Sequence, residues 1–180
     1  MSEIKVLLLR GVNVAGANRL PMPEFRQMLL EQGLQHIHTH LQSGNAVYLD
    51  PGVTGVEEKI STAMKERFGF APPMFVMPLA DYDAILAANP FQKQGEANGA
   101  LVHIWFLESP ASISAQAFAA HAAQGEQILF SDKAVYLLAP NGIGRSVLAA
   151  KLESGLKMVK TARNYTSAMA IAALARTIPI

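Results

Sequence analysis

The chain has 180 residues, of which 51% are hydrophobic and 16% are charged, so it can fold as one domain or two small ones and is not a disordered polypeptide. It contains no cysteine, which excludes disulfides, thiolate catalysis and cysteine-based zinc sites and makes the cytoplasm the expected compartment. Its apolar runs are too short to cross a membrane and its N-terminus shows no secretory signal, so no membrane partner is expected. The net charge of +1 indicates no partner by itself.

The first half of the chain predicts the β-α-β-β-α-β order of a ferredoxin-like domain. Apolar residues at helical spacing predict one helix that begins near Pro23 and a second from Val56 to Phe68. A short connecting helix is expected at residues 79–88. Strands are expected at residues 5–9, 36–41, 46–49 and 74–77.

After a polar segment with glycine and proline at residues 89–99, the same order begins again. The expected elements are strands at 101–107, 128–130, 135–138 and 158–161 and helices at 113–122, 146–156 and 167–176. We therefore expect an α+β fold of two ferredoxin-like (α/β-plait) halves, each an antiparallel sheet with helices on one face. The predicted domains are residues 1–90 and residues 100–180, the second with an extra C-terminal helix.

The usual strand order of this fold, 4-1-3-2, predicts a candidate site in the first half. It brings the loop 10–19, after the first strand, and the turn 42–45, before the third, to one edge of the sheet. Their glycines, asparagines and arginines suit a pocket for a small anion, but such residues also serve ordinary turns, and no dinucleotide or Walker motif is present. The candidate ligand-binding residues are Arg10, Asn13, Asn18, Ser43, Gly44 and Asn45.

The second half carries a basic segment, residues 141–176, with six cations against one acidic residue and a local charge of +5. It indicates either solvated helix faces or a surface that meets an anion. The glycine-rich stretch before residue 146 leads into a helix and offers N–H groups to an anion, although Ser146 can equally be a plain helix cap. Residues 160–166 suit phosphate contact and stacking, or a chain end pinned to the core. The candidate residues are Gly142, Gly144, Arg145, Ser146, Arg163, Asn164 and Tyr165.

Trp105 shares a strand face with His103, and together with Tyr136 this face suits a base-stacking platform. We prefer the interpretation that it packs against the other half. The three alternating histidines at 36, 38 and 40 are interpreted as a solvated sheet face rather than a metal site, and no metal or cofactor is expected. Nothing in the sequence requires an enzyme, and nothing excludes one.

Four ordered segments resemble motifs of the bacterial domain of unknown function 1697 family (DUF1697): Leu8–Asn18, Leu41–Asn45, Asn141–Ser146 and Thr161–Asn164. The resemblance covers nearly the whole chain and implies a pair of ferredoxin-like domains, but no reaction. Two positions depart from the family pattern. Ala15–Asn18 stands where Gly-Gly-Lys-Asn is usual, which weakens an anion site in the first loop, and Tyr165 stands where tryptophan is usual.

Three functional hypotheses follow. The basic segment and its glycine-rich helix start favour a binding module for nucleic acid or a phosphorylated ligand, and this is the hypothesis we prefer. Two glycine- and arginine-bearing sites in one chain favour an enzyme or sensor for a small anionic metabolite in a cleft between the halves. The aromatic face around Trp105 favours a protein-interaction module.

Overall fold

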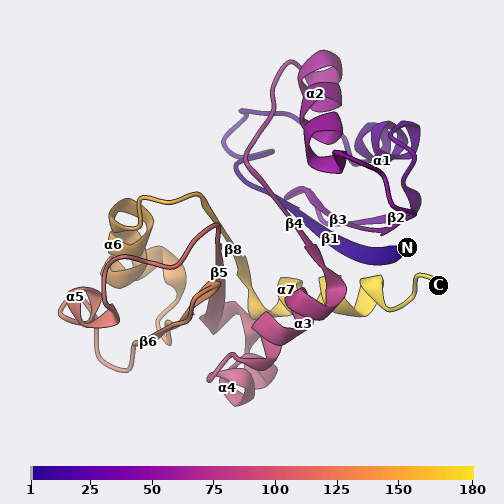
Figure 1. The fold of residues 1–180 in the computed structure, drawn as a ribbon. Helices are drawn as coiled ribbons and strands as arrows, with labels where there is room; N and C mark the ends of the chain where they lie inside the picture. Colours follow the sequence, from indigo (N-terminus) through magenta and orange to yellow (C-terminus); the bar gives the residue numbers. More distant parts are fainter. Residues whose placement is uncertain (1) are drawn as a thin grey trace. The chain divides into compact units, whose positions relative to one another are not determined.

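The computed structural model describes residues 2–180 and has two four-stranded antiparallel sheets, with strand orders β2-β3-β1-β4 and β6-β7-β5-β8 (Figure 1). Both orders are the 4-1-3-2 arrangement of a ferredoxin-like domain, which confirms the predicted fold class. The chain forms two compact units. One comprises the residues up to Asp83 together with Ala170–Ile180, and the other is Ala84–Met169.

The first unit places one face of its sheet against two helices, as Figure 1 shows. Val56, Ile60 and Met64, four residues apart along α2, are all buried and join the core formed with α1 and this sheet face. Gly69, at φ 81°, ends α2 in the left-handed conformation that glycine adopts at little cost. The elements are β1 (Glu3–Leu9), α1 (Met22–Glu31), β2 (Gln35–His40), β3 (Asn45–Asp50), α2 (Val56–Phe68), β4 (Met74–Pro78) and α3 (Leu79–Ala87).

The second unit repeats the pattern, and its core lies between the second sheet and the helices α5 and α6. The elements are α4 (Gln92–Ala97), β5 (Val102–Leu107), α5 (Ala115–Ala119), β6 (Gln127–Phe130), β7 (Ala134–Leu138), α6 (Val147–Gly155), β8 (Lys160–Asn164) and α7 (Tyr165–Ala175), with 3-10 turns at Gly99–Leu101 and Ile143–Arg145. The division between the units falls inside α3 and inside α7.

Three elements of this unit have bounds that differ from the prediction. The closing strand runs to Asn164 rather than residue 161, because residues 160–164 all pair with β5. The last helix begins directly after it, since the Asn164 side-chain oxygen accepts a 2.8 Å hydrogen bond from the Ser167 N–H and satisfies a free donor of the first turn. The helix α5 covers only Ala115–Ala119, within the predicted 113–122.

Candidate functional site

The first-half loops meet at one edge of the sheet, as the strand order predicts. The Leu9 N–H donates to the Gly44 carbonyl at 2.9 Å, and the Asn13 Nδ2 donates to the Gln42 carbonyl at 2.6 Å. The Arg10 N–H donates to the Pro73 carbonyl at 3.0 Å, so the start of β4 is at this edge too.

The asparagine amides at this edge are used inside the fold. Asn13 also donates to the Leu20 carbonyl at 3.0 Å and accepts from the Leu20 N–H at 2.8 Å, and Asn18 donates to the Gly11 carbonyl at 3.0 Å. Asn45 is buried, and its Nδ2 donates to the His40 carbonyl and to the Ser43 Oγ, both at 2.9 Å. These bonds favour the turn interpretation, and a ligand role for the residues stays a prediction.

Gly44 is required by packing as well as by conformation. Its φ is 74°, and a Cβ added there would lie 2.7 Å from the Leu9 Cβ and 2.8 Å from the Val12 Cγ2. The close approach of this turn to β1 therefore explains the glycine without a ligand.

The second-half candidates lie around one edge of the second sheet. In the antiparallel register Leu138 pairs with Val102 and Asn164 pairs with His103, so β7 and β8 end where β5 begins. The glycine-rich segment follows β7 directly. The two second-half motifs thus reach the same sheet edge, which the strand order makes necessary.

The glycine-rich segment forms a turn that leads into α6. Gly142 has a φ of 87°, and its N–H donates to the Ala139 carbonyl at 2.9 Å. Ser146 caps the helix, because its Oγ accepts from the Ala149 N–H at 2.9 Å. Gly144 and Arg145 are exposed, and the Arg145 guanidinium forms no ion pair with any residue in the described range 2–180.

Arg163, Asn164 and Tyr165 do not form one surface. Consecutive strand residues point to opposite faces, so Arg163 and Asn164 diverge. Arg163 is 8% exposed, and its Nη1 donates to the Thr161 Oγ1 at 2.9 Å and to the Ala162 carbonyl at 2.8 Å. The Tyr165 ring packs on Gly95, where an added Cβ would lie 2.5 Å from the Tyr165 Cγ. These contacts favour the alternative of a chain end pinned to the core.

Fewer cations of the basic segment are exposed to a ligand than its sequence indicates. Lys160 is only 3% exposed, Arg163 is buried, and the Arg176 Nη2 pairs with the Asp83 Oδ1 at 2.7 Å within the first unit. The exposed cations of the segment in the second unit are therefore Arg145, Lys151 and Lys157.

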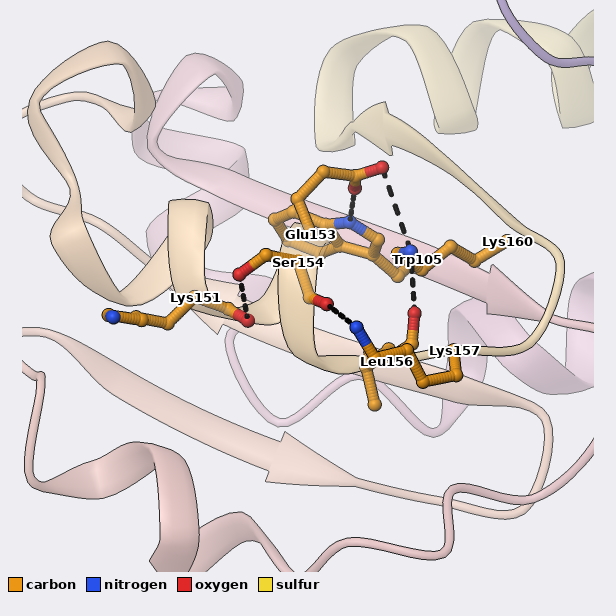
Figure 2. A network of polar contacts seen from close by, with 7 residues as sticks. All are labelled: Trp105, Lys151, Glu153, Ser154, Leu156, Lys157 and Lys160. Atoms are coloured by element: carbon orange, nitrogen blue, oxygen red, sulfur yellow. Dashed lines mark hydrogen bonds and ion pairs between the residues drawn. The ribbon is translucent and has the colours of Figure 1, made fainter.

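Sequence reasoning missed a polar network at the C-terminal end of α6, shown in Figure 2. The Glu153 carboxylate accepts from the Trp105 Nε1 at 3.2 Å and lies 3.7 Å from the Lys160 Nζ, which donates to the Leu156 carbonyl at 2.8 Å. Lys157 donates to the Ser154 carbonyl, also at 2.8 Å. Ammonium groups at the last carbonyls of a helix satisfy free acceptors and suit its dipole. No local sequence signal joins Trp105 to Glu153, because they are distant along the chain.

The prediction that the strand face of Trp105 packs against the other half of the chain is wrong. Trp105 is buried against α5 and α6 of its own unit, in one cluster with Phe118, Leu148 and Leu152. Tyr136 pairs with Ile104 and therefore lies on the opposite face, fully buried. These two rings form no open stacking platform.

His103 lies at the sheet edge where β7 and β8 end. Its Nδ1 is buried and has no hydrogen-bond partner, and its ring centroid is 6.1 Å from that of Trp105. Burial lowers the pKa of His103 to about 4, so the ring is neutral near pH 7. Asn164 is its direct cross-strand neighbour.

The alternation of the three histidines is interrupted. A register shift separates Gln35 from His38, and His36 has a φ of 50°, so only His38 and His40 follow simple alternation. Within residues 2–180 no group of three or more histidine or carboxylate side chains is placed to hold a metal ion.

A groove of about 520 Å³ lies along α2 in the first unit. It is lined by Gln32, Thr54, Gly55, Glu58, Lys59, Thr62, Ala63 and Glu66. None of the candidate residues lines it, so the groove and the candidate sites are separate features.

Comparison with known proteins extends these observations. A family model described as "Protein of unknown function (DUF1697)" matches residues 2–136. The structure of a conserved bacterial protein from Streptococcus pneumoniae superimposes with a TM-score of 0.73 at 21% identity, over 97% of this chain and 99% of that one. No curated protein matches the chain. Among the described residues, no helix combines the length and apolar character needed to span a membrane.

Proposed function

The chain belongs to the DUF1697 family, whose function is unknown, and from the geometry of its second unit we propose that it binds a phosphorylated ligand at the sheet edge where β7 and β8 end. The observation that carries the proposal is Arg145, an exposed guanidinium on a glycine turn that has no ion pair among residues 2–180. A guanidinium matches phosphate geometry with two parallel donors.

Several neighbouring residues support a phosphate site at this edge. Gly144 is exposed, and nothing lies within 4 Å of the position of a Cβ added there, so a ligand can approach the backbone closely. The cations Lys151 and Lys157 are exposed on the same unit and raise the local concentration of anions.

The geometry favours a small ligand over a nucleic acid. An extended phosphate backbone is bound by many cations, and burial of Lys160 and Arg163 leaves only three exposed cations of the basic segment in the second unit. Single-stranded binding also needs exposed aromatic rings, and both Trp105 and Tyr136 are buried. A cytoplasmic location, expected from the absence of cysteine, stays a prediction, and the proposal requires no catalysis.

The test titrates the intact chain with inorganic phosphate, pyrophosphate, a nucleoside monophosphate and a labelled single-stranded oligonucleotide at low and physiological salt. Binding of a small phosphate compound should weaken about tenfold to a hundredfold in Arg145→Ala, as expected for loss of a charge-assisted hydrogen bond. Lys133→Ala is the matched control, because Lys133 is an exposed cation directly before β7, at the opposite end of that strand.

The different probes distinguish a small phosphate compound from a nucleic acid as the ligand. Binding of the oligonucleotide alone, with a steep salt dependence, assigns the phosphate chemistry to nucleic acid instead. No binding of any probe at low salt, or equal loss in Arg145→Ala and Lys133→Ala, would refute a phosphate site at this edge.

A further inference from the structure

Two large apolar side chains are exposed at the loop edge, by which we mean residues 10–19 and 41–44 of the first unit. Val14 is 60% exposed and Leu41 is 58% exposed. Each is the sequence neighbour of one partner in the Asn13–Gln42 hydrogen bond, so they lie on the two loops that this bond joins. Single exposed apolar residues are common on protein surfaces, but these two coincide with a second unusual feature.

That feature is the backbone conformation. Five non-glycine residues in the described part of the chain have positive φ, and four of them lie in the loop edge: Asn13, Ala15, Asn18 and Leu41. Asparagine tolerates this region, whereas a bulky residue such as Leu41, at φ 57°, is strained there. Glycine or asparagine would suit the turn better. Local stability therefore does not explain a solvent-exposed leucine at this position, and strain of this kind gathers at functional sites.

The loop edge is also fixed in shape. The Asn13 side chain bonds to both Leu20 and Gln42, and Asn18 bonds back to Gly11. A surface that is ordered before binding loses less conformational entropy when a partner docks.

Charge and side-chain type indicate the partner. Residues 10–22 and 35–49 contain Arg10 and Arg19 but no aspartate or glutamate, and Arg19 is exposed. The exposed apolar side chains are aliphatic, which does not suit stacking of bases, and the aromatic residue of these segments, Tyr48, is buried. We propose that the loop edge is a docking surface for a partner protein that presents an acidic segment with apolar side chains.

This surface belongs to the first unit and is independent of the phosphate site proposed for the second. The probes are short synthetic peptides in which leucine, isoleucine or phenylalanine is placed among aspartate and glutamate, and a matched set with lysine in place of the acids. The intact chain is expected to bind members of the acidic set, more weakly at high salt, and to bind the lysine set less tightly.

The decisive variant is Leu41→Asn, which removes the apolar side chain and keeps a residue suited to positive φ. It should weaken peptide binding about tenfold while leaving the melting temperature unchanged or raised. A purely structural role for Leu41 cannot produce that combination. Leu129→Asn, at another exposed leucine, is the matched control. The variant Arg19→Glu should also lower the affinity for the acidic peptides, because it reverses a charge on this surface.

Four results would each overturn the proposal. These are failure of every acidic peptide to bind, equal affinity for the acidic and lysine sets, unchanged binding in Leu41→Asn, and tighter binding of a single-stranded oligonucleotide that competes with the peptides. Binding lost in Leu41→Asn and kept in Leu129→Asn would support it.

Discussion

The His103 ring makes the stability of the second unit depend on pH over a defined interval. Burial lowers its pKa from 6.5 to about 4 in the folded chain, while the unfolded chain keeps the ordinary value. Between these values the unfolded state binds the proton and the folded state does not. The free energy of unfolding therefore falls as the pH is lowered from about 6.5 to about 4 and gains no further contribution from this group outside that interval.

The magnitude follows from the two pKa values. At about 1.4 kcal/mol per pH unit, the full difference corresponds to about 3 kcal/mol. The ring is partly exposed, so solvent screening reduces the expected effect to about 1–2 kcal/mol. The buried Nδ1 without a partner also costs free energy in the neutral state, so His103→Phe should be at least as stable as the wild type at pH 7.

The assay is urea unfolding followed by circular dichroism across this pH range, for the wild type and His103→Phe. Carboxylates titrate in both proteins and cancel in the difference between them. That difference should shift by about 1–2 kcal/mol in favour of the variant as the pH falls. Trp105, the single tryptophan, should report the same step, because a protonated imidazole beside it quenches its emission. Parallel unfolding profiles, with no fluorescence step near pH 4, would refute the reasoning.

Three further predictions concern stability and are checked by urea or thermal unfolding. Gly44→Ala should destabilise the fold by about 2–4 kcal/mol, because the added Cβ meets atoms 2.7 Å away, whereas Gly16→Ala, with nothing within 4 Å, should cost only about 1 kcal/mol; equal losses would contradict the packing argument. Asn13→Ala should cost about 1–3 kcal/mol and leave phosphate binding intact, which a titration of the variant checks. Glu153→Gln removes the carboxylate beside the buried Lys160 ammonium and should cost about 1 kcal/mol, since Glu153 is half exposed; an unchanged midpoint would show that the pair contributes nothing.

The order of elements was predictable because apolar periodicity distinguishes strands from helices over most of the chain. Val56, Ile60 and Met64 mark α2 by spacing alone. The end of β8 was not predictable in this way, since Lys160, Arg163 and Asn164 are polar residues in a paired strand. Pairing with β5 stabilises the strand conformation of these residues, which their own strand propensity does not favour.

The positions of the candidate residues in the fold were predictable, but their contacts were not. Strand order alone brings the loop after β1 to the turn before β3, and the hydrogen bond between Leu9 and Gly44 confirms it. Sequence could not show that Asn45 and Arg163 are buried, because both residue types are usually exposed. It also could not show the bulge at His36, which depends on the pairing of β2 with β3.

The division of the chain has a consequence for its synthesis on the ribosome. Ala170–Ile180 belongs to the first unit, yet it is translated after all of the second. At about 5–20 residues per second, the intervening segment takes roughly 5–15 s to make, which is longer than many small domains need to fold. During that time the nascent first unit lacks Ile171, Ala175 and Ile178, which are buried in the finished protein. Its apolar surface is then open to chaperones and to aggregation until the last helix arrives.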